Sequence, residues 1–157
     1  MSKPTARKPT MTVSGYETSV PRTAVALGLV VLGIAWIVVY VTLAHDAATF
    51  VPLGAVKPPS TPVPWMADLK NWNYLIGFGL IMIGLAVSAH PKTPLGRGRG
   101  VVIGMLGCFL LGLLWIVVFY FVGSDYAIPV MQDLGQYNLV VGIAFMAVGF
   151  TFATRWE

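Results

Sequence analysis

One apolar stretch occurs twice in this chain. The first copy reads L-G-L-V-V-L-G-I-A-W-I-V-V-Y from Leu27 to Tyr40, and the second reads L-G-C-F-L-L-G-L-L-W-I-V-V-F from Leu106 to Phe119. The copies lie at a constant offset of 79 residues and share two Leu-Gly pairs and the run Trp-Ile-Val-Val. Agreement of this kind at one offset indicates an internal duplication.

Each copy lies inside an uncharged apolar run of just over twenty residues, 24–44 or 101–122. A helix rises 1.5 Å per residue, so either run spans about 30 Å, the thickness of a bilayer's hydrocarbon core. The chain is 57% hydrophobic and only 10% charged, which is too apolar for an ordinary soluble domain. Both runs are therefore predicted to be transmembrane helices, in preference to buried helices of a soluble protein.

The duplication continues beyond the first spans, now at an offset of 65 residues. The recurring residues are Pro64, Met66, Asp68, Leu69, Asn73, Gly77 and Gly84, which return as Pro129, Met131, Asp133, Leu134, Asn138, Gly142 and Gly149. Each repeat is therefore predicted to be a helical hairpin: a span, an outer loop and a second apolar span. We expect the second spans at about 72–89 and 139–154.

The predicted fold is an all-α membrane protein with four transmembrane helices, arranged as two hairpin repeats of parallel orientation. Its parts are a disordered basic tail (1–23), a first two-span hairpin (24–89), a basic linker (90–100) and a second two-span hairpin (101–157). The tail has too few apolar residues to form a core.

Basic residues fall mainly on one side of the predicted membrane. The tail, the linker and the C-terminus hold eight of the ten, among them Arg7, Lys8, Arg22, Arg97 and Arg99. The positive-inside rule therefore predicts a plasma-membrane protein with both termini and the linker in the cytoplasm. Because each repeat contains two spans, the repeats are expected to be related by a pseudo-twofold axis along the membrane normal.

The predicted spans offer no catalytic or metal-binding group. None contains Asp, Glu, Lys, Arg or His, which argues against ion-coupled transport. His45 and His90 are expected at opposite ends of the first hairpin, too far apart to share a metal ion or haem. Asp68 and Asp133 are expected to cap the following helices rather than to form a catalytic pair. We therefore predict no cofactor, no metal and no enzymatic activity.

Small residues and tryptophans are the remaining features of the spans. The residues Gly100, Gly104, Cys108 and Gly112 recur every four positions and form a stripe, which we expect to join the two hairpins. The other candidate packing residues are Gly33, Gly77, Gly84, Gly142 and Gly149. Trp36 and Trp115 are expected in mid-span. Each ring is expected to pack either against a membrane partner or into the space between the hairpins.

Several motifs follow one another in order: a basic tail, a span with G-x-x-W-[IV]-x-V, a loop ending in W-M-A-x-L-x-x-W-N-Y, a glycine-spaced span and a final R-W. The loop motif comprises Trp65, Met66, Asp68, Trp72 and Asn73, with Asp133 and Asn138 as second-repeat counterparts, and Arg155-Trp156 is the closing motif. In these features the chain resembles the CrgA family of actinobacterial septation proteins, here as two fused copies of a two-span unit.

The resemblance implies a non-enzymatic membrane protein of the division machinery that scaffolds or regulates septum formation. It implies contacts with FtsZ-linked assembly and with the septal transpeptidase, and a location at the septum of dividing cells. The expected partners are these division proteins and the lipid bilayer, with no nucleic acid, and self-association into a homo-oligomer is left open. The competing hypotheses are an accessory subunit of another membrane complex and, less favoured, a small four-span transporter.

Overall fold

A computed structural model describes residues 18–52, 54, 56–122 and 128–154. Within these ranges every regular element is helical, so the prediction of an all-α fold is confirmed there. Residues 1–17 of the predicted disordered tail, which include Arg7 and Lys8, lie outside the described residues. Arg155 and Trp156 also lie outside them.

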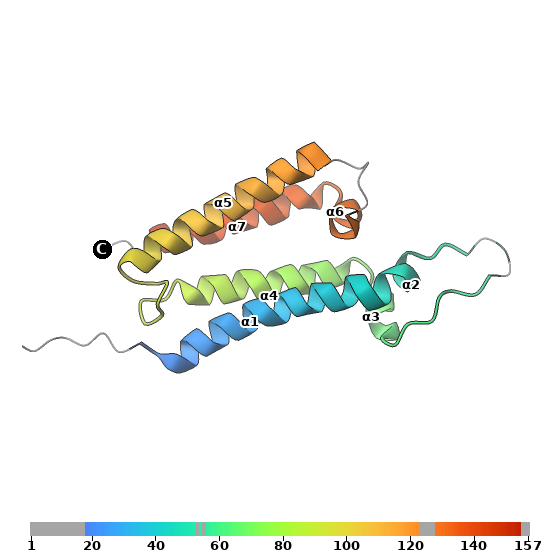
Figure 1. Ribbon diagram of the computed structural model, residues 1–157, viewed down its shortest axis with the longest axis horizontal. Helices are drawn as coiled ribbons and strands as arrows, with labels where there is room; N and C mark the ends of the chain where they lie inside the picture. The colour runs from blue at the N-terminus through green and yellow to red at the C-terminus, as the bar shows by residue number, and fades with distance from the viewer. Residues whose placement is uncertain (1–17, 53, 55, 123–127, 155–157) are drawn as a thin grey trace, which may run out of the picture.

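The first hairpin contains one long helical rod and one returning helix. The rod consists of α1 (Val20–Val39), a π-helical turn η1 (Tyr40–Ala44) and α2 (His45–Thr49), and the short α3 (Pro64–Leu69) leads into the returning α4 (Trp72–Ser88). The second hairpin consists of α5 (Arg99–Val122), the short α6 (Pro129–Leu134) and the returning α7 (Tyr137–Ala153). We call the end of the bundle that carries α3 and α6 the loop end and the opposite end, where residues 89–98 join the hairpins, the linker end (Figure 1).

Two expected boundaries change. Residues 20–23 belong to α1, so Arg22 lies in the first turn of a helix and not in the tail. Arg99 opens α5 instead of closing the linker. Pro21 explains the earlier start of α1, because proline is well tolerated in a first helical turn, where its missing N–H has no partner within the helix.

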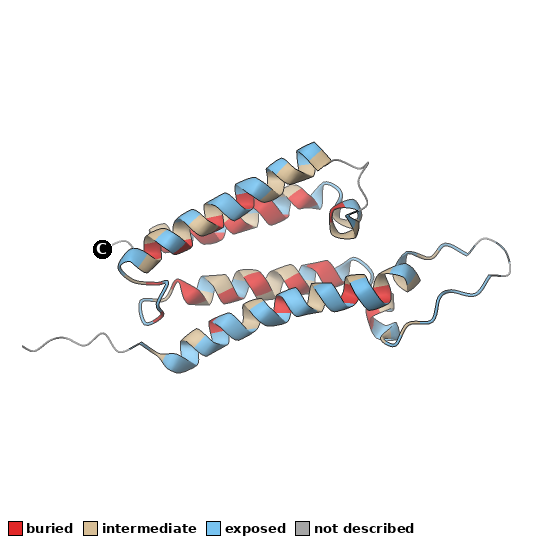
Figure 2. Cartoon of the chain, in the orientation of Figure 1, coloured by how far each residue is buried: buried red, intermediate tan, exposed pale blue. Residues whose placement is uncertain are grey.

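Two helices are long and apolar enough to cross a membrane, Val20–Thr49 and Arg99–Val122. The returning helices α4 and α7 are equally apolar but have 17 residues each, about 26 Å of helix. Outward-facing residues of α1 and α5 are largely exposed and apolar (Figure 2). Exposed apolar surface of this extent suits lipid chains better than water.

Glycine contacts hold each hairpin together. The structure packs α1 along α4 and α5 along α7, and α4 meets α7 between the hairpins. A Cβ atom added to Gly33 would lie 2.5 Å from the carbonyl oxygen of Gly77, and one added to Gly112 would lie 2.5 Å from that of Gly142. Only glycine, which has no side chain, allows two backbones to approach so closely. Both hairpins therefore close through the same contact at equivalent positions.

A second pair of glycines lies farther toward the linker end. A Cβ atom on Gly84 would lie 2.8 Å from the carbonyl oxygen of Ala26, and one on Gly149 would lie 3.3 Å from that of Met105. These partners are again 79 residues apart in the sequence. The equivalent contacts keep the two helices of each hairpin close along much of their length.

The expectation that the stripe on α5 joins the two hairpins is wrong. Gly104 packs against the ring of Phe152 and Gly112 against Gly142, so both face α7 of the same hairpin. A stripe of small residues serves the neighbour whose backbone comes closest, and that neighbour is the other helix of the hairpin. The main helix contact between the hairpins is that of α4 with α7.

Replacing Gly112 by Leu should destabilise the bundle, because the new side chain has to displace the backbone of Gly142. Overpacking of this kind costs about 1–3 kcal/mol, which should lower the melting temperature in detergent by about 2–12 °C. The matched control is Gly107→Leu on the same helix, where an added Cβ meets nothing within 4 Å. Equal melting temperatures for the two variants would contradict the glycine contact.

Candidate functional site

A buried asparagine holds the corner between each short helix and the returning helix. The side-chain amide of Asn73 donates to the carbonyl oxygens seven and three residues earlier, at 2.7 and 2.8 Å, and that of Asn138 donates to the equivalent two oxygens, both at 2.8 Å. Both side chains are fully buried. Each amide therefore donates hydrogen bonds to carbonyl oxygens that have no partner within the short helix at its C-terminal end.

The corner itself is a tight turn that favours glycine. Lys70 has φ 46° and ψ −130°, and Gly135 at the equivalent position has φ 47° and ψ −124°. Asn71 and Gln136 follow with φ near −64°. These are the angles of a type II′ turn, whose first central residue is normally glycine. Lys70 is the only non-glycine residue with positive φ in the part of the chain that the structure describes.

The expected capping role of the two aspartates is wrong. Asp68 lies within α3 and Asp133 within α6, one tight turn before the long helices. The N-cap residues of α4 and α7 are Asn71 and Gln136, and neither makes a side-chain capping bond. The short helices separate each aspartate from the N–H groups that it was expected to cap. Asp68 is exposed, whereas Asp133 turns toward the first hairpin.

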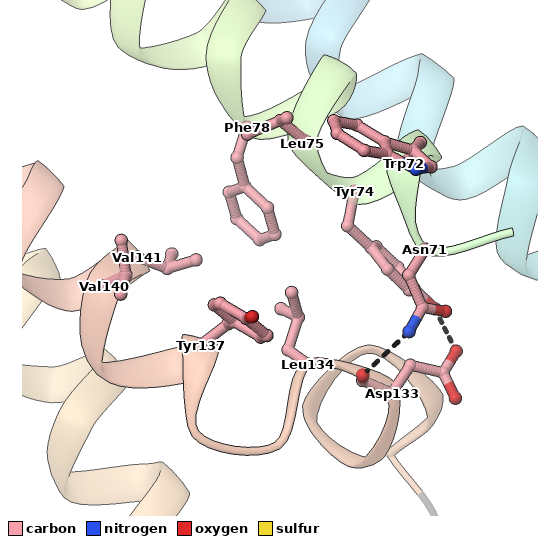
Figure 3. A pocket seen from close by; sticks show the side chains of 10 residues that line it. All are labelled: Asn71, Trp72, Tyr74, Leu75, Phe78, Asp133, Leu134, Tyr137, Val140 and Val141. Atoms are coloured by element: carbon pink, nitrogen blue, oxygen red, sulfur yellow. Dashed lines mark hydrogen bonds between the residues drawn. The ribbon is translucent and has the colours of Figure 1, made fainter. Parts of the chain in front are cut away.

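Asp133 makes the main polar contact between the hairpins (Figure 3). The hydroxyl of Tyr74 donates to Asp133 Oδ2 at 2.8 Å, and the side-chain amide of Asn71 donates to the Asp133 carbonyl oxygen at 3.2 Å. His45 Nε2 lies 2.9 Å from the same Oδ2, although the ring is not oriented for a hydrogen bond. The histidine therefore contributes charge attraction when it is protonated.

Aromatic packing surrounds this contact. Tyr40 and Tyr74 are fully buried, and their rings meet edge to face with centroids 5.1 Å apart. The ring of Tyr40 also lies 6.2 Å from that of His45. We call Tyr40, His45, Tyr74 and Asp133 the loop-end cluster. A hydrogen bond to a carboxylate is strong in such a poorly solvated place, and leaving one partner unpaired there is costly.

The loop-end cluster forms once, although the chain is duplicated. Its three aromatic members come from the first hairpin, where the second hairpin has Phe119 in place of Tyr40 and Leu139 in place of Tyr74. Its carboxylate comes from the second hairpin. Sequence analysis missed the cluster, but one signal was present: its two tyrosines stand at positions where the other repeat has an apolar residue.

A groove of about 340 Å³ opens beside the cluster, between α4 and the α6–α7 corner. Trp72 and Tyr137 stand at its mouth, exposed to 65% and 71%, and occupy equivalent positions of the two repeats. Leu75, Phe78 and Val140 make apolar walls. The groove can hold apolar groups of a partner, and its one carboxylate already has partners in Tyr74 and His45.

The two mid-span tryptophans lie in different surroundings. The ring of Trp36 meets Trp65 of the loop motif edge-on at 5.4 Å, within the first hairpin. The ring of Trp115 meets Phe78 at 5.4 Å, across the boundary between the hairpins. Both indole N–H groups are buried without a hydrogen-bond partner. Trp115 thus fills space between the hairpins, whereas Trp36 supports the loop motif.

The remaining predicted residues are distributed over both ends. Met66 is buried in the first loop-end corner, where it packs with Tyr40 and Tyr74. Arg22, Arg97 and Arg99 lie at the linker end, and the linker is tied to the start of α1 by a hydrogen bond from Ser19 N to the Lys92 carbonyl oxygen. No group of three or more His, Cys, Asp or Glu side chains that could hold a metal ion occurs among the residues described.

Comparisons with known proteins agree with the duplication. The family model described as Cell division protein CrgA matches residues 1–92 and again residues 89–157. A Streptomyces avermitilis protein of that name is 47% identical over 53 residues, which cover 34% of this chain and 60% of the relative. One from Corynebacterium aurimucosum is 38% identical over 75 residues, which cover 45% of this chain and 80% of the relative. No solved structure matches the chain significantly.

Replacing Lys70 by Gly should stabilise the protein, because glycine adopts the positive φ of this corner without steric cost. Strain at such a residue is about 1–3 kcal/mol, so we expect the melting temperature to rise by a few degrees. The reciprocal variant Gly135→Lys should lower it. Opposite signs in thermal denaturation would support the turn assignment, and a drop for both variants would refute it.

Replacing Asp133 by Ala should weaken the contact between the hairpins, because it leaves the buried hydroxyl of Tyr74 without its acceptor. The expected loss is about 1–3 kcal/mol in the free energy of unfolding. The matched control Asp68→Ala removes an exposed carboxylate at the equivalent position and should change stability by about 0.5 kcal/mol or less. A double-mutant cycle with Tyr74→Phe isolates the pair, and additive effects would show that the two side chains are not coupled.

Proposed function

Because the chain belongs to the CrgA family of cell division proteins, we propose that it is a non-enzymatic membrane component of the division machinery. The double family match carries this proposal, since it places both halves of the chain in the same family. In this role the protein scaffolds or regulates septum formation by contacting FtsZ-linked assembly and the peptidoglycan-synthesising transpeptidase. The described residues support binding surfaces more readily than catalysis, because the carboxylate of Asp133 at the loop end is engaged with Tyr74 and His45.

The proposed topology has four spans with both termini in the cytoplasm. The described basic residues near the start of α1 and in the linker all lie at the linker end, as the positive-inside rule requires of a cytoplasmic face. The helices α4 and α7 are somewhat short for a span. A short helix can still cross a membrane by local thinning and by placing interfacial aromatic residues at its end, and Trp72 and Tyr137 are so positioned.

The surface that we propose for a membrane partner is centred on Trp36 and Trp65 of the first hairpin. Their rings pack edge to face, and Trp65 is half exposed. A half-exposed tryptophan that is supported by a second ring offers the kind of large apolar surface that anchors a partner at an interface. Trp115 is assigned to packing between the hairpins, because its ring lies against Phe78.

The proposal is tested by following a fluorescent fusion in dividing cells. We expect a band at the septum, and uniform membrane staining would refute the division role in favour of a subunit of another complex. In the same cells Trp36→Ala should reduce co-purification of the septal transpeptidase by about tenfold or more, as expected for an anchoring tryptophan. Trp115→Ala should instead lower thermal stability and leave the co-purified amount per folded protein unchanged.

A further inference from the structure

A second pocket, distinct from the groove at the loop end, lies at the linker end. Its volume is about 570 Å³, and it opens where α1, α4 and α7 come together between the two hairpins. Arg22 and His90 contribute its polar side, Thr151 and Thr154 line it from the end of α7, and apolar residues at the end of α4 complete it. We propose that this pocket binds the phosphate of an anionic phospholipid headgroup, a ligand that the division role does not by itself require.

Among the described residues, acidic side chains gather at one end of the bundle and basic side chains mainly at the other. Asp46, Asp68 and Asp133 are the acidic residues of the described ranges, and all three lie on α2, α3 or α6 at the loop end. The linker end carries Arg22, Lys92, Arg97 and Arg99. Arg22 is the cationic side chain that lines the pocket. A guanidinium binds phosphate and carboxylate groups, so an anion is the class of ligand that suits it.

Arg22 is positioned to bind a phosphate. Arg22 lies in the first turn of α1, and Nη1 of its guanidinium contacts the ring of His90. This contact holds the side chain over the pocket. The Nε–Nη2 edge of a guanidinium matches two oxygens of a phosphate in a bidentate arrangement. A contact that fixes the long side chain in advance reduces the entropy lost on binding.

The end of α4 does not repel an anion as strongly as a bare helix C-terminus would. Thr93 is almost fully buried, and its hydroxyl lies 2.5 Å from the Ser88 carbonyl oxygen and 2.6 Å from that of His90. The hydroxyl thus covers carbonyls that the helix leaves open, where the negative end of the helix dipole is concentrated.

The chemistry of the pocket favours a lipid over a soluble phosphate. Ala86 and Val87 line the same pocket as Arg22 and present apolar surface there, which suits the glycerol backbone and the first methylenes of an acyl chain. Pockets that place basic side chains between transmembrane helices on the cytoplasmic side are suited to anionic headgroups. This step rests on the proposed orientation, which puts the linker end at the cytoplasmic leaflet.

The test uses the purified full-length chain in detergent and measures its melting temperature during titration with a phospholipid. Phosphatidylglycerol should raise the melting temperature saturably, while phosphatidylcholine and inorganic phosphate at the same concentrations should not. Equal stabilisation by phosphatidylcholine would overturn the proposal of an anionic ligand. Equal stabilisation by inorganic phosphate would overturn the assignment to a lipid. Neither result depends on the septal partner, so failure here is separable from failure of the division role.

Two glutamine variants separate the pocket from general surface charge. Arg22→Gln should weaken the apparent affinity for phosphatidylglycerol by about fivefold, the equivalent of about 1 kcal/mol for one basic residue at the membrane surface. Lys92→Gln removes an exposed charge at the same end, outside the pocket, and should change the affinity by less than about twofold. Equal losses for the two variants would overturn the pocket. A third variant, Thr151→Leu, keeps all charges, occupies the lining and should also weaken binding.

Discussion

The bundle depends on the close approach of two pairs of helix backbones at Gly33–Gly77 and Gly112–Gly142. Within a lipid bilayer, apolar side chains gain little by leaving lipid for another helix, so close packing and polar contacts must hold helices together. The glycines allow that packing and set the spacing within each hairpin. This spacing in turn decides where α3 and α6 can return along the bundle, and therefore where the loop-end cluster and its groove can form.

The two hairpins are alike inside and different where they meet. Each closes through equivalent glycines and turns its corner on an equivalent asparagine, but among the described carboxylates only that of Asp133 reaches across to the other hairpin. One such contact can suffice in a fused chain, because the short linker keeps the hairpins at high effective concentration. The equivalent Asp68 is left exposed, and the second hairpin carries phenylalanine and leucine where the first carries Tyr40 and Tyr74.

The amino-acid sequence predicted the helices, the packing glycines and the gathering of basic residues near the linker, because each is a local or periodic property of the chain. It did not predict the helix that faces the α5 stripe, since a row of small residues indicates close approach without naming the neighbour. The positions of the aspartates were also missed. The first central residue of a type II′ turn is normally glycine, so the lysine at position 70 gave no indication of such a turn. The Tyr74–Asp133 bond joins residues 59 positions apart, which no local pattern reveals.

The π-helical turn explains how the first hairpin brings two of its side chains to Asp133's side of the bundle. In a regular α-helix, residues five positions apart point about 140° away from each other. In η1 the His45 N–H donates to the Tyr40 carbonyl oxygen, an i to i+5 bond that sets one residue nearly above the other. Tyr40 can therefore pack on Tyr74 while His45 reaches the carboxylate of Asp133. A straight α-helix through Tyr40–Ala44 would turn one of the two away, so the approach of His45 to Asp133 beside a packed Tyr40 depends on this single widened turn.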